Sequence, residues 1–428
     1  MNYKLDKLKN GVRVLTVPMA SSESATITVW VKTGSRYEEA RVNGISHFLE
    51  HMVFKGSAKY PSAKVVSETI DVLGAENNAG TSKDWTNFWI KTASINLEKA
   101  FDVLADVVLN PLLKEKEIER ERRVIYEEIA MYEDTPIMDI GEKFENLVYD
   151  GTPLSWKIAG DKTTLPMINR AEFEKYRREK YHSENILISV AGGVSESRVE
   201  ELSRKYFGSI KKGPQSVKKS YLFKGVKPVS ERVLLKTKQN ADQAHLILGF
   251  LAEGRGSKSR FPQALLSAIL GKGMSSRLFT EVREKRGLAY GVRASIDRYE
   301  DVGTFNVYAG VTISKIDEAV KVILGELYAV ATRKKKISPK ELAKSKSYLK
   351  GKLALSLEDS GAVGDYFAEQ VLFDEKIETP KEIYSELDKV EVDQIYAEAE
   401  KLFKKDGVYL SVIGPYNDHD KFVKLLNS

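Results

Sequence analysis

The stretch NGISHFLEHMVFKGS, residues 43–57, contains two histidines four positions apart and a glutamate directly before the second histidine. Its apolar periodicity predicts a helix from about residue 43 to residue 55. On a helix, His47 and His51 project from one face, so both imidazoles can reach one metal ion, and Glu50 lies near the same face. The stretch therefore predicts a metal site, with zinc as the ion, that still lacks a third ligand.

Glu50 has the position and chemistry of a general base. Zinc with three protein ligands keeps a fourth position for water and lowers the pKa of that water toward neutrality. A carboxylate beside the zinc-bound water can take its proton and pass the proton to a leaving amine. The order H-x-x-E-H is an inverted form of the zinc-site motif. The alternative interpretation is a surface helix that carries two of the five histidines of the chain by coincidence.

A long charged helix, expected at about residues 115–134, offers the third ligand. Its apolar stripe is predicted from four residues: Val124, Ile125, Met131 and Tyr132. Glu121 and Glu128 fall on the same stripe, where carboxylates are costly unless a positive group meets them. Glu127 falls on the opposite, solvated side. Periodicity therefore favours Glu128 or Glu121 as the third ligand, and the alternative is that both pair with buried arginines.

The composition is that of a soluble globular protein. The 428 residues are 42% hydrophobic and 30% charged, and the net charge is +6, with basic and acidic residues interleaved, so no nucleic-acid partner is predicted. Cysteine is absent, which excludes disulfides and thiol chemistry. We find no signal peptide and no apolar run of about 18 residues, so we expect no membrane partner and a cytoplasmic location.

The order of expected elements occurs twice along the chain. Strands and helices alternate, and several strands alternate apolar and polar residues, which predicts an α+β fold with mostly antiparallel sheets. The segments 92–110 and 311–330 share one pattern, and their offset of about 220 residues indicates a duplicated domain rather than a solenoid. We predict domains at 1–211 and 232–428, joined by a polar linker at 212–231.

These features together resemble the pitrilysin family, which includes insulysin and the mitochondrial processing peptidase. The resemblance rests on H-x-x-E-H, the 76 residues that follow it, and then Glu128 with another glutamate seven positions earlier. It implies that His47, His51 and Glu128 bind one zinc ion per chain and that Glu50 is the general base. Glu121 would then orient one of the zinc ligands, as metal sites usually require.

Two further segments extend the resemblance. GAENNAGTSKDWTNFW, residues 74–89, is similar to the edge strand at which the family adds a peptide substrate as an extra strand, and Asn78 and Ala79 match the positions that meet the peptide backbone. GKGMSSRLFTEVREKRGLAYGV, residues 271–292, is similar to the segment that carries the family's Arg and Tyr seven residues apart. The resemblance implies that Arg283 and Tyr290 hold the substrate carbonyl and its oxyanion.

The second copy is expected to bind no metal. It contains no H-x-x-E-H, and Ser345 and Lys352 fall at the places of Glu121 and Glu128. Short members of the family pair two chains around a cavity. The resemblance therefore implies a zinc-dependent endopeptidase that hydrolyses short or unfolded peptides inside a dimeric chamber. Because the chain carries both landmarks, a homodimer is the simpler expectation, and a heterodimer is the alternative.

Two other functions compete with this prediction. The first is a non-catalytic core-type subunit of the same fold, serving as an assembly or partner protein, although such subunits tend to have degraded metal motifs. The second is a metal-dependent hydrolase that acts on something other than peptides, which would make the edge-strand segment and the Arg/Tyr pair coincidences. The natural substrate and the cleavage preference do not follow from the residues.

Overall fold

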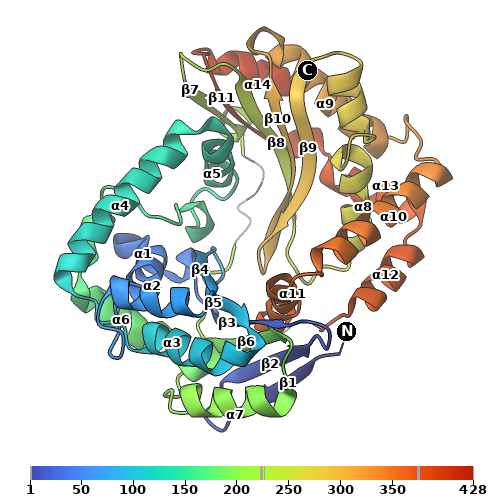
Figure 1. The fold of residues 1–428 in the computed structure, drawn as a ribbon. Coiled ribbons are helices and arrows are strands. Elements are labelled where there is room, and N and C mark those ends of the chain that lie inside the picture. The colour runs from blue at the N-terminus through green and yellow to red at the C-terminus, as the bar shows by residue number, and fades with distance from the viewer. Residues whose placement is uncertain (1, 222–224, 226, 374–375, 428) are drawn as a thin grey trace. The chain divides into compact units, whose positions relative to one another are not determined.

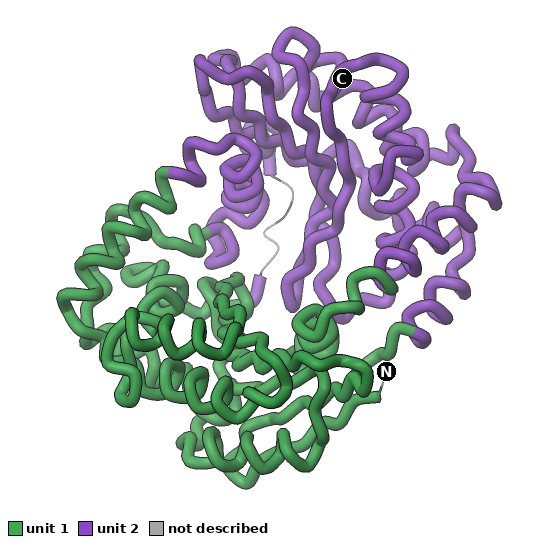
Figure 2. Tube along the Cα trace, viewed as in Figure 1, with its two compact units in different colours: residues 1–130, 156–219, 354–380 green, residues 131–155, 220–353, 381–428 purple. Residues whose placement is uncertain are grey.

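The computed structural model describes residues 2–221, 225, 227–373 and 376–427. The chain forms two compact units that interleave along the sequence (Figure 2). The first unit consists of residues 1–130, 156–219 and 354–380, and the second consists of residues 131–155, 220–353 and 381–428. Each half of the sequence therefore contributes one segment to the unit built mainly from the other half.

The first unit is built on a six-stranded sheet with the order β1-β2-β6-β3-β5-β4 (Figure 1). Only β2 and β6 run parallel, and the other neighbouring pairs are antiparallel. Strand β4 therefore lies at one edge of the sheet. The bounds are β1 (Lys4–Lys7), β2 (Arg13–Pro18), β3 (Ser24–Val31), β4 (Glu76–Thr81), β5 (Thr86–Ala93) and β6 (Ile186–Gly192).

The two faces of this sheet carry different side chains. Along β3, Ala25, Ile27, Val29 and Val31 all belong to the main hydrophobic core, because alternate residues of a strand point to one face. The helices of this unit are α1 (Ile45–Val53), α2 (Ala63–Val72), α3 (Leu97–Leu109), α4 (Glu115–Asp134), α6 (Arg170–Lys180), α7 (Glu196–Phe207) and α11 (Ser360–Leu372).

Helix α11, from late in the sequence, covers the other face of the first sheet. Thr26, which points away from the main core, hydrogen-bonds through its hydroxyl to Ser360 Oγ at 2.8 Å. Ser189 Oγ donates to the carbonyl of Gly364 at 3.3 Å, and a Cβ at Gly364 would already lie 3.3 Å from that hydroxyl. The small residues at this contact therefore let the helix lie close against the sheet.

The second unit repeats this topology with five strands. Their order is β7-β11-β8-β10-β9, in which β7 and β11 are parallel and the other pairs antiparallel. The order matches β2-β6-β3-β5-β4 strand for strand, so β9 is the counterpart of the edge strand β4. The bounds are β7 (Val233–Thr237), β8 (Ala244–Glu253), β9 (Ala289–Arg298), β10 (Val302–Val311) and β11 (Val408–Gly414).

Helix α5, from the first half of the sequence, covers one face of this second sheet. Ile140 and Phe144 of α5 pack in one cluster with Ile247, Tyr409 and Ile413 of the strands. The helices of this unit are α5 (Pro136–Val148), α8 (Arg260–Gly271), α9 (Ile316–Ala331), α10 (Pro339–Ser356), α12 (Pro380–Lys389), α13 (Val392–Leu402) and α14 (His419–Asn427), with the π-helical segment η8 (Phe279–Glu284).

The predicted fold class is confirmed: each unit is a mostly antiparallel sheet covered by helices. The boundaries 1–211 and 232–428 stay a prediction about which residues were duplicated together. Residues 212–221 of the predicted linker have no regular secondary structure, whereas residues 222–224 and 226 lie outside the described residues. Within the described ranges, every helix is too short or too polar to span a membrane.

Candidate metal centre

Helix α1 brings the two histidines of the motif together. The helix begins after Gly44, whose φ of 99° lies in the left-handed region that favours glycine. His47 and His51 lie one turn apart, and their Nε2 atoms are 3.2 Å from each other. His47 is buried, with 8% of its surface exposed, whereas His51 is half-buried. The Nε2 atoms of both rings therefore lie close enough together to bind one ion at the surface of the helix.

Glu128 of α4 completes the group. Its Oε2 atom lies 3.5 Å from His47 Nε2 and 3.4 Å from His51 Nε2. The three atoms thus form a nearly equilateral triangle. A tetrahedral zinc ion with ligands about 2.0–2.1 Å away separates those ligands by about 3.3–3.4 Å. The donor set and its spacing therefore fit zinc.

Two buried atoms in this group have no conventional partner. Glu128 Oε2 receives no hydrogen bond, and His47 Nδ1 makes none, within the described part of the chain. A buried carboxylate oxygen without a donor is costly unless a cation meets it. The unsatisfied oxygen is the same atom that faces both imidazoles. This is a second observation, independent of the spacing, that favours a bound cation here.

Glu121 holds His51 from the side away from Glu128. Glu121 is buried, and its Oε1 lies 3.0 Å from His51 Nδ1. Lys55 Nζ lies 2.8 Å from the other oxygen of Glu121. When Nδ1–H donates to the carboxylate, the Nε2 atom of His51 is left with a lone pair for a metal. The contact with Glu121 therefore orients the His51 ring with Nε2 toward Glu128.

The electrostatics of the group are dominated by burial and by the two carboxylates. Burial and the neighbouring His51 lower the pKa of His47, which keeps this ring neutral. Burial alone would lower the pKa of His51, but Glu121 and Glu128 outweigh burial and raise it to about 9. The His51 ring lowers the pKa of Glu128 below its usual value. The site therefore favours positive charge between two ionised carboxylates.

The same chain matches known proteins over nearly its whole length. The profile of the insulinase family (peptidase family M16) matches residues 13–162, and that of the peptidase M16 inactive domain matches residues 167–349. A Bacillus subtilis protein named "uncharacterized zinc protease YmxG" is 36% identical, over 95% of this chain and 97% of that protein. The chain belongs to peptidase family M16.

Other similar proteins agree with this assignment. A Rickettsia felis protein, also named an uncharacterized zinc protease, is 33% identical over 97% of this chain and 98% of its own length. The crystal structure of a Helicobacter pylori protease superposes with a TM-score of 0.88 at 26% identity, covering 96% of this chain and 99% of that one. The predicted family is therefore confirmed, and its named relatives support a zinc peptidase at the level of the family.

Glu50, the predicted general base, lies on α1 between the two histidines. Burial raises the pKa of Glu50 above its usual value, while a hydrogen bond from Thr81 opposes the rise. In that bond the Thr81 hydroxyl donates to Glu50 Oε2. Thr81 is the last residue of the edge strand β4. The carboxylate next to the metal ligands is therefore tied directly to the end of that strand.

Strand β4 carries the predicted substrate residues. Strand β4 pairs with β5, where Asn78 lies opposite Trp89 and Ala79 lies opposite Phe88. Among the residues described, no strand pairs with the other edge of β4. Asn78 is exposed, and its Oδ1 accepts the backbone N–H of Ala79 at 2.9 Å. The predicted edge strand is confirmed, and its backbone is available for pairing at one side.

Arg283 and Tyr290 lie close together in the second unit, whereas the metal group lies in the first. The Arg283 guanidinium lies over the Tyr290 ring, 5.1 Å from its centroid, and over the Phe279 ring at 4.8 Å. Tyr290 is 77% exposed at the start of β9. The contact therefore brings two hydrogen-bond-donating side chains together, one of them well exposed.

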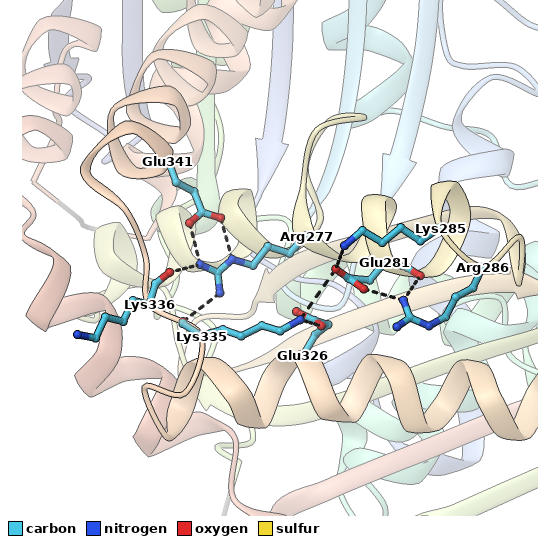
Figure 3. A network of polar contacts seen from close by, with 8 residues as sticks. All are labelled: Arg277, Glu281, Lys285, Arg286, Glu326, Lys335, Lys336 and Glu341. Atoms are coloured by element: carbon cyan, nitrogen blue, oxygen red, sulfur yellow. Dashed lines mark hydrogen bonds and ion pairs between the residues drawn. The ribbon is translucent and has the colours of Figure 1, made fainter.

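A network of ion pairs anchors the segment that carries Arg283 (Figure 3). The Arg277 guanidinium makes two hydrogen bonds of 2.7 Å with the carboxylate of Glu341. Glu281 accepts from Lys285 at 2.7 Å and from Arg286 at 2.6 Å. The Arg277 pair ties the chain just before η8 to α10, and the Glu281 pairs link η8 to the residues that directly follow it.

Sequence reasoning missed two residues of the metal centre. Lys55 pairs with Glu121, and a signal for it existed, because His47, His51 and Lys55 follow at intervals of four. Thr81 bonds to Glu50 across thirty-one positions of sequence, and no local pattern marks it. The apolar stripe predicted on α4 was wrong at three of its four residues, since Val124 is 46%, Met131 52% and Tyr132 40% exposed. Those side chains lie on the solvent side instead.

Proposed function

We propose that the chain is a zinc-dependent endopeptidase that hydrolyses short or unfolded peptides. The observation that carries this proposal is the triangle of His47 Nε2, His51 Nε2 and Glu128 Oε2, with sides of 3.2, 3.4 and 3.5 Å. Glu50 lies on the same helix, within one turn of both histidines. This arrangement has the ligands and the base that metal-assisted hydrolysis needs.

Three residues would bind the metal, and Glu121 would orient one of them. Zinc, when bound, would polarise a carbonyl and lower the pKa of water at the site. His47, His51 and Glu128 would bind it, and Glu121 would keep Nε2 of His51 turned toward it. Lys55 neutralises the second oxygen of Glu121, so this buried carboxylate does not stand as an unpaired charge.

Glu50 acts as the proton carrier in this proposal. A general base works best when its pKa is near the working pH, and burial moves the pKa of Glu50 in that direction. Its carboxylate takes a proton from the attacking water and gives it to the nitrogen of the leaving amine. The hydroxyl of Thr81 holds one oxygen of Glu50, which leaves the other oxygen for the proton transfer.

Strand β4 supplies the substrate platform. An extended peptide can add to its free edge through backbone hydrogen bonds, with Asn78 and Ala79 at the contact. Because Thr81 is the last residue of β4 and bonds to Glu50, a peptide paired with β4 would extend to the vicinity of the Glu50 carboxylate. Pairing of this kind requires an extended chain, so folded proteins are excluded and short or unfolded peptides are selected.

Arg283 and Tyr290 complete the proposal as donors to the substrate carbonyl and its oxyanion. We further propose a homodimer that forms a chamber, in which the pair of one chain serves the metal centre of the other. Support comes from the chain carrying both landmarks and from the full-length match to short M16 relatives. A heterodimer with a different M16 chain is the alternative outcome.

The test is digestion of a mixed peptide library, read by mass spectrometry, with wild type beside Glu50→Gln and Glu127→Gln. Glu127 is the exposed neighbour of Glu128, so its variant is the matched control. We expect wild type and Glu127→Gln to bind zinc and cleave peptides, and Glu50→Gln to bind zinc without cleaving. A zinc-loaded wild type that cleaves nothing would support the non-catalytic subunit instead.

A further inference from the structure

Glu38 lies buried at the beginning of the helix that carries the metal ligands. Its side chain is 1% exposed and comes from a bend seven residues before α1 starts. Oε1 accepts the backbone N–H of Ser46 at 2.8 Å, and Oε2 accepts the backbone N–H of Gly44 at 2.8 Å. Oε2 also accepts a hydrogen bond of 2.8 Å from Asn43 Nδ2. The carboxylate thus closes the first turn of α1.

Helix α1 needs an external cap because its own first residue cannot provide one. The first N–H groups of a helix have no partner within the helix, and a Ser, Thr, Asp or Asn side chain usually accepts one of them. Four other helices of the unit have such a residue: α2 has Ser62, α6 has Asn169, α7 has Ser195 and α11 has Asp359. Helix α1 has Gly44 in that position instead.

Gly44 cannot be replaced by a capping residue without moving the backbone. Its φ of 99° is strained for residues with a side chain, and a Cβ there would lie 2.8 Å from the carbonyl oxygen of Ala159. The close approach of the chain at Ala159 therefore requires glycine. The capping oxygen has to come from another part of the chain, and Glu38 provides it.

Further polar contacts tie the same turn to its surroundings. Ser46 Oγ and Tyr176 OH are 2.7 Å apart, and Tyr176 OH lies 3.1 Å from Thr33 Oγ1. Asn43 Nδ2 donates to the carbonyl of Lys157 at 3.0 Å as well as to Glu38. Ser46 directly precedes His47, so the bond from its N–H to Glu38 acts within one residue of a ligand.

A buried carboxylate in this place costs stability. Burial raises the pKa of Glu38 to about 7, although hydrogen bonds from Ser46, Gly44 and Asn43 oppose the rise. A neutral capping side chain would avoid that cost. Costly buried polar groups occur most often where function requires them. The carboxylate also places negative charge at the positive end of the α1 dipole, which stabilises the first turn.

We propose that Glu38 is a positioning residue of the metal centre, which holds the first turn of α1 so that His47 stays in register with His51 and Glu128. This inference rests on the metal site of the proposed function. Its consequence is specific: loss of the cap displaces His47, in the first turn, more than His51, in the last. The three ligand atoms then no longer form the triangle that fits one ion.

The experiment compares Glu38→Gln with Glu39→Gln, a change at the neighbouring, exposed residue. Gln keeps the shape of Glu38 but replaces one acceptor oxygen by a donor, so one N–H bond of the first turn is lost. We expect Glu38→Gln to bind zinc about 10- to 100-fold more weakly, as is usual when a residue that orients a ligand is removed. Glu39→Gln should bind zinc as wild type does.

Two readouts separate positioning from general destabilisation. The absorption spectrum of Co²⁺-loaded protein reports the ligand geometry, and we expect it to change in Glu38→Gln. Hydrogen–deuterium exchange of the metal-free protein should rise in peptides covering residues 43–50 and stay unchanged in the sheet of the first unit. Uniformly faster exchange throughout that unit would overturn the proposal, because it indicates a purely structural role.

Zinc binding by wild type in the same titration separates this inference from the proposed function. If wild type binds no zinc, both proposals fail. If wild type binds zinc and Glu38→Gln binds it equally well with an unchanged Co²⁺ spectrum, only the role of Glu38 fails. Should Glu38→Gln not fold, Glu38→Asp is measured in the same way. This variant keeps the charge but has a shorter side chain, so it should bind zinc more weakly than wild type, and wild-type affinity with an unchanged Co²⁺ spectrum would overturn the proposal.

Discussion

Helices α1 and α8 precede corresponding edge strands in the two units, yet they carry different kinds of side chain. In the first unit α1 leads through α2 to the edge strand β4, and in the second α8 leads through η8 to its counterpart β9. Helix α1 places His47, Glu50 and His51 at one surface. Helix α8 buries apolar residues along most of its length, with Gln263 and Ser267 as its buried polar side chains.

The following helices differ in the same way. Helix α4 buries Glu121 and turns Glu128 toward the histidines, whereas α10 has the buried Ser345 and the exposed Lys352 at the matching places. One topology therefore carries the group of His47, His51 and Glu128 in one copy and the pair of Arg283 and Tyr290 in the other. The two units therefore differ in a few side chains rather than in topology, and topology alone does not determine function.

Removal of the α4 ligand is expected to have the largest effect. Glu128→Gln should abolish zinc binding and peptide cleavage, a loss larger than the roughly 10- to 100-fold that follows removal of a residue that only orients a ligand. Lys352→Gln, at the matching place of α10, should change neither. Zinc content by elemental analysis and the rate of peptide cleavage are the measurements. Equal zinc in wild type and Glu128→Gln would break the comparison.

Arg283→Ala tests the role of the second unit. We expect kcat/KM to fall about 10²- to 10³-fold with zinc content unchanged, since a single donor to an oxyanion contributes on that scale. Arg293→Ala in β9, which removes a guanidinium over the Tyr308 ring of β10, is the matched control and should keep full activity. Mixing Arg283→Ala with Glu50→Gln should restore part of the activity if the pair acts on the other chain of a dimer.

Glu121→Gln tests the orientation of His51. The variant loses the charge that fixes the Nδ1 proton of His51 and leaves Lys55 without its carboxylate. We expect zinc affinity to fall roughly 10- to 100-fold, which a chelator competition titration measures. Ser345→Ala, at the matching place of α10, should leave zinc affinity unchanged. An unaltered affinity in Glu121→Gln would show that His51 is oriented by other groups.

The smallest effect is expected from the ion pairs around η8. Lys285 and Arg286 lower the pKa of Glu281 from 4.5 to about 2. A carboxyl whose folded pKa is lowered stabilises the protein above its ordinary pKa, and the stabilisation is lost as pH falls from about 4.5 toward 2. Because both partners are largely exposed, we expect Glu281→Gln to cost about 0.2–1 kcal/mol at pH 7.

Urea denaturation at pH 7 and pH 3 checks this prediction. The difference between wild type and Glu281→Gln should shrink at the lower pH, because the unfolded wild-type chain then binds a proton at Glu281 and the folded protein, with its lower pKa, mostly does not. Glu284→Gln, an exposed change in the same segment, serves as the control and should differ little from wild type at either pH. A difference that grows on acidification would contradict the assignment.

The sequence predicted the parts of the site that follow from periodicity. The charged helix occupies residues 115–134 as expected, and Glu127 is exposed while Glu121 is buried. The helical repeat relates Glu121 and Glu128 to Ile125 between them, which is buried. Ile125 is the one residue of the predicted apolar stripe that is buried, whereas Val124, Met131 and Tyr132 lie at the surface.

Contacts between distant segments could not be predicted in this way. Thr81 bonds to Glu50, and Glu38 caps α1, through side chains whose partners are set by tertiary packing. Apolar patterns show which face of a helix is buried but not which sheet it packs on. The sequence pattern therefore could not predict that α5 packs on the second sheet and α11 on the first, although both helices have apolar faces.

The position of α11 has a consequence for biosynthesis. The last strand of the first sheet, β6, ends at Gly192, and the helix that covers its second face begins at Ser360. At about 5–20 residues per second, a ribosome needs roughly ten to thirty seconds to make the residues between them. During that interval the nascent first sheet presents an uncovered face, so a cellular chaperone has a defined window in which to bind this chain.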